Sequence, residues 1–307
     1  MKTWIVLCLG SSFLLNGAEL EWNMEKPWQQ DGGVYSLSYE GKGWPALTRR
    51  VPVLAGKFYR LVWEDRLTGG DAPKWQVFFR RGGKNMGGDA FPLSAEWTSR
   101  TVYFYSGKDG ELEHRFAPDP GKAGQISIRG FVWEELSPEQ LRSSLLPNGN
   151  FESASAGAGF WKDLNWKNPV PPVKLVRGQQ FLNGETSLEM ILPKREKSVF
   201  GIQSRSLPME PGRTYLFSFW AKADVPMGIT AAVSIWAPSG HRGKHSNQTR
   251  EFKIETDWKR YDWEVAIPFD AAKYPDLVER MGSLVFMTRK AGQTGTLWLD
   301  DILFRHK

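Results

Sequence analysis

Hydrophobic and polar residues alternate with a period of two along much of this chain. In residues 215–221, one face carries aromatic or small apolar side chains and the other carries Leu216, Ser218 and Trp220. Residues 231–237 repeat the pattern, with Ser234 and Trp236 on the polar-facing side. Such alternation is typical of half-buried antiparallel strands. With about eight such runs in each half, the chain is predicted to be all-β and built as two-sheet jelly-roll sandwiches.

An internal repeat divides the chain. The run "AGKFYRLVWEDR" near Ala55 matches "PGRTYLFSFWAKAD" near Pro211. A shift of 156 positions (212 − 56) superimposes equivalent residues of the two runs: Gly56 on Gly212, Tyr59 on Tyr215 and Arg49 on Arg205. Later runs match in the same order, "EWTSRTVYF" with "DWKRYDWEV" and "GQISIRGFVW" with "GTLWLDDILF". The order of these matches predicts a tandem duplication whose second copy begins at "LLPNGNFES".

The repeat sets the expected boundaries. The first module spans residues 19–136, a polar linker spans 137–143, and the second module spans 144–307. We expect the linker to form one helical turn that begins at Ser137 and Pro138. The stretch "LLPNGNFES" is read as a short apolar strand followed by an Asn-Gly turn. So short a linker restricts the relative orientation of the two modules.

The N-terminus resembles a secretory signal peptide. Lys2 precedes the apolar run "WIVLCLGSSFLL", and small residues follow up to Ala18, after which cleavage is expected. The alternative is a buried first strand. The apolar run is too short for a transmembrane anchor. The protein is therefore predicted to be secreted, periplasmic or at the cell surface, and to lose Cys8, its only cysteine.

Charge argues against nucleic acid as a partner. The formal net charge is +6, and the Lys and Arg residues are scattered instead of forming a tract. A modest, dispersed excess of this kind is typical of a solvated surface.

The motifs of the second copy resemble a known group of proteins. "LLPNGNFES", "PGRTYLFSFWAKAD", "TDWKRYDWEV" and "GTLWLDDILF", in this order, are similar to carbohydrate-binding modules of families 4, 9, 16 and 22. The first copy shares the resemblance only through the repeat. It implies a galactose-binding-like β-sandwich attached to bacterial glycan-degrading enzymes. It also implies non-catalytic polysaccharide or oligosaccharide binding and a structural Ca²⁺ ion near the chain ends.

Carboxylates of the second copy are candidates for that Ca²⁺ site. Glu152 follows the first expected strand, and Asp300 and Asp301 lie in the last one. Calcium prefers oxygen ligands of this type, although ordinary solvated charges would give the same pattern. In the first copy, Arg129 and Gly130 replace the two aspartates. Metal is therefore predicted in the second module only.

Aromatic side chains on the polar-facing side of a strand are candidate sugar platforms, because a flat ring stacks on the apolar face of a pyranose. The predicted ligand-binding residues are Trp220, Trp236, Ser218, Ser234, Gln203 and Arg205. The alternative is that these tryptophans cover a sheet beneath a loop. Trp258 and Trp263 are assigned to the core, because each opens or continues a strand and Trp258 recurs as Trp97.

The first copy lacks both proposed platforms. The same shift places Glu64 on Trp220 and Arg80 on Trp236. If the two strands are neighbours, these opposite charges pair across the sheet. The first module is therefore expected to have lost or changed its ligand site.

No enzyme motif stands out, since neither a Gly-x-Ser-x-Gly elbow nor a His-Glu-x-x-His helix occurs. The sequence therefore favours an exported, non-catalytic glycan-binding protein. Two alternatives stay open: a structural or protein-binding sandwich protein at the cell surface, and an enzyme with two carboxylates in a cleft.

Overall fold

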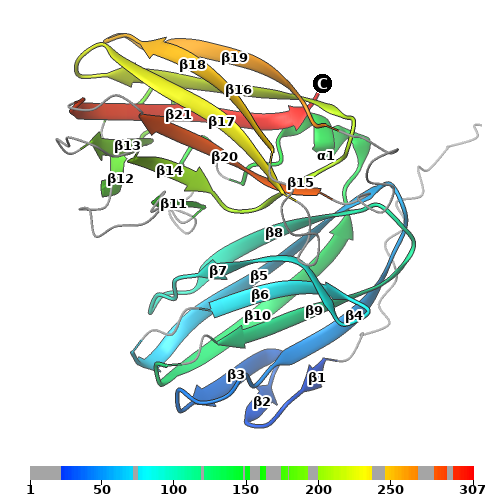
Figure 1. The fold of residues 1–307 in the computed structure, drawn as a ribbon. Helices are drawn as coiled ribbons and strands as arrows, with labels where there is room; N and C mark the ends of the chain where they lie inside the picture. Colours follow the sequence, from blue (N-terminus) through cyan, green and yellow to red (C-terminus); the bar gives the residue numbers. More distant parts are fainter. Residues whose placement is uncertain are drawn as a thin grey trace, which may run out of the picture.

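Two antiparallel β-sandwiches follow one another in the computed structural model of the chain (Figure 1). The structure describes residues 22–71, 75–118, 121–147, 149–152, 160–163, 174–178, 180–192, 200–236, 246–268, 280–288 and 293–307. The predicted signal peptide and Ala18 lie outside these residues. The described residues form no helix that is long and apolar enough to cross a membrane.

The first sandwich consists of two five-stranded sheets. Its strands are β1 (Asn23–Met24), β2 (Trp28–Asp31), β3 (Val34–Tyr39), β4 (Leu47–Val53), β5 (Lys57–Gly70), β6 (Trp75–Arg81), β7 (Lys84–Phe91), β8 (Thr98–Ser106), β9 (Gly110–Pro118) and β10 (Gly124–Glu135). One sheet has the order β1-β4-β9-β6-β7 and the other β2-β3-β10-β5-β8. Alternate side chains of the two sheets face each other and form a core rich in aromatic rings.

The second sandwich follows the helix α1 (Pro138–Ser143). Its strands are β11 (Trp161–Asp163), β12 (Lys174–Gly178), β13 (Ser187–Leu192), β14 (Phe200–Ser204), β15 (Leu207–Met209), β16 (Thr214–Ala223), β17 (Met227–Trp236), β18 (Ser246–Ile254), β19 (Lys259–Ala266), β20 (Arg280–Thr288) and β21 (Gly295–His306). One sheet has the order β11-β14-β20-β17-β18, with β15 also paired to β20, and the other β12-β13-β21-β16-β19.

The two sandwiches have the same strand order. The sheet β2-β3-β10-β5-β8 corresponds strand for strand to β12-β13-β21-β16-β19, and β4-β9-β6-β7 corresponds to β14-β20-β17-β18. The predicted all-β, two-sandwich fold is confirmed. The expected count of about eight strands per copy was too low. The missed strands are short ones such as β1 and β11, which have too few residues to show alternation.

Repeated residues occupy equivalent places in both sandwiches. Gly56 and Gly212 both adopt positive φ, 73° and 78°, where glycine is favoured. The Tyr59 hydroxyl accepts a hydrogen bond from the backbone N–H of Leu54 at 2.8 Å, and the Tyr215 hydroxyl accepts one from Glu210 at 2.9 Å. The turns before β5 and β16 therefore have the same glycine conformation and the same tyrosine hydrogen bond.

The start of the second copy is held by backbone contacts and not by a strand. Leu145 is fully buried, and its N–H donates to the Phe304 carbonyl at 2.7 Å. The N–H of Ile302 donates to Gly149 at 2.9 Å. The predicted apolar strand is therefore wrong, because these residues form isolated bonds to β21 and no ladder. A Cβ on Gly149 would lie 2.0 Å from the Ile302 carbonyl oxygen, which explains the glycine of the motif.

The linker and an apolar interface join the modules. The helix α1 begins after Ser137, whose hydroxyl accepts from the Gln140 N–H, as the expected helical turn requires. Phe58, Tyr103 and Tyr105 lie on the outer side of β5 and β8 and belong to the core cluster of the second module. Figure 1 shows β8 of the first sandwich next to β15 of the second.

Candidate functional site

The predicted platform tryptophans lie in different sheets. Trp220 belongs to β16 and Trp236 to β17, and these strands lie on opposite sides of the sandwich. Positions on the solvent side of the two strands therefore point away from each other. The side chain of Trp236 is outside the described part of the structure. A platform shared by Trp220 and Trp236 is incompatible with this topology.

The same topology overturns the pairing expected in the first module. Glu64 lies in β5 and Arg80 in β6, again in opposite sheets. Glu64 accepts instead from Arg129 Nε of the neighbouring strand β10 at 2.8 Å. Arg80 donates to Glu113 of β9 at 3.2 Å. Each charge thus finds its partner within its own sheet.

Two predicted residues lie close together on the outer side of the β17 sheet. Gln203 Nε2 donates to Ser283 Oγ at 2.5 Å, and Ser283 is the ladder partner of Ser234. The neighbouring residues Ala232 and Val285 on this side are buried, with 1% and 3% exposure. Among the described residues, the centre of this side offers little open surface to a ligand.

Arg205 lies between the modules. Its side chain is buried, its guanidinium carbon lies 4.0 Å from the centroid of the Phe91 ring, and Nη1 donates to the Ala90 carbonyl. The adjacent N–H of Ser206 donates to Asp89 at 2.7 Å. Burial lowers the Arg205 pKa to about 10. Arg205 was predicted to contact a glycan, but it contacts the first module here.

Three tryptophans gather on the outer side of the sheet β12-β13-β21-β16-β19. Trp220 and Lys222 alternate with buried residues of β16, and Trp298 is the ladder partner of Lys222 on β21. Trp258 precedes β19 on the other side of Lys222. Trp220, Trp258 and Trp298 are all half-buried, and we call them the tryptophan face.

Polar contacts hold the tryptophan face in place. The Lys222 ammonium lies 5.3 Å from the centroid of Trp298 and 5.6 Å from that of Trp258, and it donates to Gln180 Oε1 at 2.7 Å. The indole N–H of Trp298 donates to Glu189 at 2.9 Å. Ser218 lies on the same side of β16 as Trp220, but it is buried beside a register shift.

Sequence reasoning missed part of this face. Trp298 was not a candidate, although it alternates with buried Leu297 and Leu299 as Trp220 does with its neighbours. Trp258 was assigned to the core, yet it lies half-buried against Lys222. Trp263 does pack against the core as predicted. The recurrence of Trp258 as Trp97 indicates a structural role. It does not show whether the side chain lies in the core or on the surface.

The three carboxylates predicted to bind calcium hold a loop. Glu152 Oε1 accepts from the N–H groups of Glu185 and Thr186, both at 3.0 Å. Asp300 Oδ2 accepts from Leu182 N–H at 3.0 Å, and Asp301 Oδ2 accepts from the Asn183 amide at 2.9 Å. N–H donors repel a cation. Within the described residues, no three Asp, Glu, His or Cys side chains are grouped for metal binding. These contacts do not fit a site built from all three carboxylates.

Asp300 is also the carboxyl with the most perturbed pKa near the tryptophan face. Burial raises its pKa to about 6, against the opposing effect of the N–H donors that it accepts from. Its Oδ1 accepts from the N–H of Asp301 at 2.8 Å. Because Asp300 is fully buried and both of its oxygens are bound, the raised pKa reflects a loop anchor and not an acid facing a cleft.

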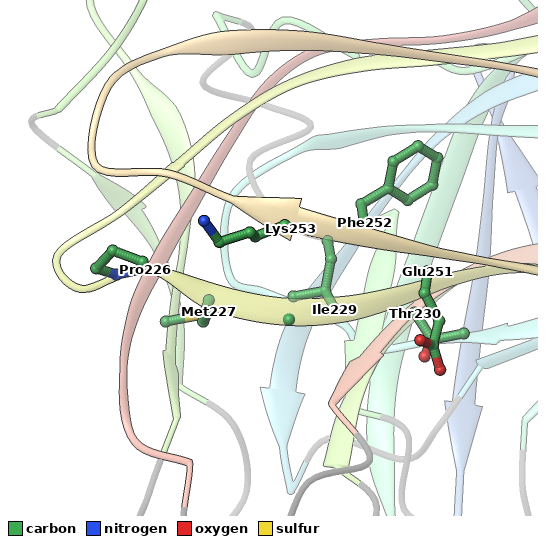
Figure 2. Close-up of a pocket in the computed structure, with 8 residues that line it drawn as sticks. Pro226, Met227, Ile229, Thr230, Glu251, Phe252 and Lys253 are labelled. Carbon is green, nitrogen blue, oxygen red and sulfur yellow. The ribbon is translucent and has the colours of Figure 1, made fainter.

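A pocket of about 420 Å³ lies at the edge formed by β17 and β18. Figure 2 shows Thr230 and Glu251 at one end and Pro226, Met227 and Lys253 at the other. Phe252 points to the opposite side of its strand and packs against the core. Apart from Phe252, whose ring packs against the core, the lining residues provide charges, a hydroxyl and aliphatic groups but no flat ring on which a sugar can stack.

Comparison with known proteins gives structural matches only. No family model matches the chain, and no curated protein matches it. The chain is similar to a tandem of two family 22 carbohydrate-binding modules from Paenibacillus barcinonensis Xyn10C, with 13% identity, a TM-score of 0.40 and 95% coverage of both chains. A family 4 module matches 52% of the chain and 99% of its own length, at 17% identity and a TM-score of 0.38. A family 16 module matches 52% and 98%, at 17% identity and a TM-score of 0.34.

Proposed function

We propose that this chain is a non-catalytic glycan-binding protein whose second module binds polysaccharide on its tryptophan face. The observation that carries the proposal is the grouping of Trp220, Trp258 and Trp298 on one side of one sheet. Half-exposed indole rings provide apolar area for pyranose rings, while Lys222 and Glu189 provide hydrogen-bonding groups for hydroxyls.

Comparison of the two modules separates scaffold from binding surface. The pair Lys222 and Trp258 recurs in the first module as Arg66 and Trp97, with a guanidinium carbon 4.5 Å from the ring centroid. This recurrence suggests a stabilising cation–π pair that belongs to the fold. Equivalent positions to Trp220 and Trp298 carry Glu64 and Ser127 in the first module. Trp220 and Trp298 are thus special to the second module and are the residues expected to bind sugar.

The surroundings of the tryptophan face support a non-catalytic role. A glycosidase needs two carboxylates facing one cleft, about 5 to 9.5 Å apart. Among the described carboxylates of this sheet side, Glu189 accepts from Trp298, Asp262 accepts from Arg260, and Asp300 is buried beneath a loop. No pair of them has been placed across a cleft in the described residues.

The test is titration of the full chain with soluble polysaccharides, followed by affinity gel electrophoresis and calorimetry. Trp220→Ala and Trp298→Ala should each weaken binding by about ten- to a hundredfold, because each removes stacking and apolar area worth roughly 1 to 3 kcal/mol. Trp97→Ala is the matched control in the first module and should leave glycan affinity unchanged.

Circular dichroism of each variant distinguishes lost binding from lost structure. If no glycan binds the wild type while Trp220→Ala and Trp298→Ala unfold it, the tryptophans are structural. The alternative of a cell-surface protein-binding sandwich would then replace the present proposal.

The family resemblance predicts calcium at Glu152, Asp300 and Asp301, although the N–H contacts of these carboxylates do not fit one site built from all three. Melting curves with millimolar CaCl₂ and with a chelator test it, because a ligand of the native state raises the melting temperature. A curve that neither reagent moves rules out a structural ion.

We also propose that the chain is exported and acts beside glycan-degrading enzymes. The motif that supports export is the apolar segment that ends at Ala18. Expression with the native N-terminus should give a mature protein outside the cytoplasm that begins at Glu19, which N-terminal sequencing would detect.

A further inference from the structure

A half-buried arginine lies at the edge of the first sandwich without a described anionic partner. Arg49 alternates with the buried residues Leu47 and Val51 on β4, so it points between the two sheets. Its guanidinium carbon lies 5.6 Å from the centroid of the Trp22 ring. Within the described residues, Nε of Arg49 has no hydrogen-bond acceptor. Burial lowers the Arg49 pKa, as expected for a guanidinium removed from water.

Two more polar side chains behind Arg49 are unsatisfied. His114 is the ladder partner of Arg49 and is fully buried. Its ring lies 4.4 Å from that of Trp133, centroid to centroid. Both ring nitrogens of His114 and the indole nitrogen of Trp133 have no hydrogen-bond partner in the part of the chain that the structure describes. Unsatisfied buried polar groups destabilise the folded state and call for an explanation.

The second module shows that the fold does not require this polar group. Val51 pairs with Leu112, and its repeat equivalent Leu207 pairs with Gly282, so Leu284 is the β20 position that corresponds to His114. Trp133 corresponds to Phe304, which stacks on Tyr215 as Trp133 stacks on Tyr59. The second module therefore has two apolar residues where the first has an imidazole and an indole N–H. Arg205, the equivalent of Arg49 in the second module, donates to the Ala90 carbonyl of the first module.

Trp22, the ring beside the Arg49 guanidinium, belongs to a small aromatic cluster that packs against the core. Trp22 lies 4.3 Å from Phe131 and 6.1 Å from Tyr35 between ring centroids, and all three are half-buried. A guanidinium with no anionic partner among the described residues thus lies beside a half-buried indole ring. Neutral sugars need no such charge, whereas a carboxylate pairs with a guanidinium through two parallel hydrogen bonds.

We propose that Arg49 of the first module binds the carboxylate of an acidic sugar whose ring lies against Trp22. His114 and Trp133 are positioning residues, because the ring of His114 lies beside Arg49 in the ladder and packs on Trp133. This site is separate from the tryptophan face of the second module, and it gives the first module a ligand of different charge.

The experiment titrates the full ¹⁵N-labelled chain with glucuronate, glucose or acetate and follows the Arg Nε–H and indole N–H signals. Glucuronate should give saturable shifts in the millimolar range that weaken as salt is raised. Glucose, which has the ring without the charge, should give none. Acetate, which has the charge without the ring, should bind more weakly than glucuronate.

Variants assign the site to Arg49. Arg49→Gln should weaken glucuronate binding about tenfold or more. Arg50→Gln is the matched control, because this next residue is exposed on the opposite side of β4 and should bind as the wild type does. The double variant His114→Leu and Trp133→Phe introduces residues that the second module already uses. It should fold and bind glucuronate less well, which keeps the test valid if Arg49→Gln does not fold. Equal shifts with glucose and glucuronate, or equal losses in the Arg49 and Arg50 variants, would overturn the proposal.

Discussion

The guanidinium of Arg205 in the second module stacks on the Phe91 ring of the first, with 4.0 Å between guanidinium carbon and ring centroid. The contact joins β7 to the segment between β14 and β15, and Ser206 adds a hydrogen bond to Asp89. An apolar contact between Phe58 and His306, 5.0 Å between ring centroids, lies in the same interface. The modules therefore share buried surface, and their unfolding should be coupled.

Arg205→Ala should weaken that coupling. A desolvated cation–π contact is worth about 2 kcal/mol, and a hydrogen bond from a charged donor about 1.5 to 3 kcal/mol. We expect the free energy of unfolding measured in urea to fall by about 2 to 4 kcal/mol, or the unfolding curve to separate into two transitions. Arg50→Ala is the control, because the Arg50 side chain is exposed and its Nε lies 3.9 Å from Glu113. Its cost should stay below about 1 kcal/mol. Equal effects of the two changes would argue against a structural role for Arg205.

Gly149→Ala tests why the motif "LLPNGNFES" contains its glycine. The new Cβ would lie 2.0 Å from the carbonyl oxygen of Ile302, which is backbone and has little freedom to move. The expected cost is about 3 kcal/mol or more in the free energy of unfolding. Gly69→Ala adds a methyl group 3.4 Å from the flexible Gln125 side chain and should cost much less. Thermal melts of both variants provide the comparison.

Local periodicity predicted which side of each strand is buried. Phe217 and Phe219 face the core and Trp220 does not, as the alternation of β16 required. Periodicity carries no information on which sheet a strand joins. Consecutive strands β16 and β17 belong to different sheets, so Trp220 and Trp236 do not share one platform. Repeat matching predicted the common topology, because it compares whole modules.

Contacts between modules were beyond sequence reasoning for a related reason. The hydrophobic pattern around Arg205 does not indicate a contact with another module. Its partners Ala90 and Phe91 lie more than a hundred residues away in the sequence. Trp258 illustrates a second limit. A residue that recurs in both copies is expected to be structural, and a surface cation–π pair satisfies that expectation as well as a core position does.

His114 should make the protein sensitive to acid. Burial, with a smaller effect of Arg49, lowers its pKa to about 3 from the usual 6.5. Between these values the unfolded chain binds a proton and the folded chain does not, so the free energy of unfolding falls as pH falls from about 6.5 toward 3. The loss contributed by this group is of the order of 5 kcal/mol at pH 3.

His114→Leu should reduce that pH dependence, because the leucine of the second module does not titrate. Urea unfolding at pH 7, 5 and 4 would measure it. His306, whose pKa burial lowers to about 4, keeps a part of the acid sensitivity in this variant. Parallel stability curves for His114→Leu and the wild type would refute the assignment.

The repeated tyrosines offer an energetic test of the duplication. Tyr59→Phe and Tyr215→Phe each remove a hydroxyl that accepts a backbone N–H, from Leu54 in one module and Glu210 in the other. Loss of the acceptor should cost about 1 to 3 kcal/mol. Tyr215 is completely buried and Tyr59 is 5% exposed, so the second change should cost at least as much as the first. Calorimetric melts would report both values. A large cost in one module with none in the other would mean that the shared sequence no longer performs the same structural task in both.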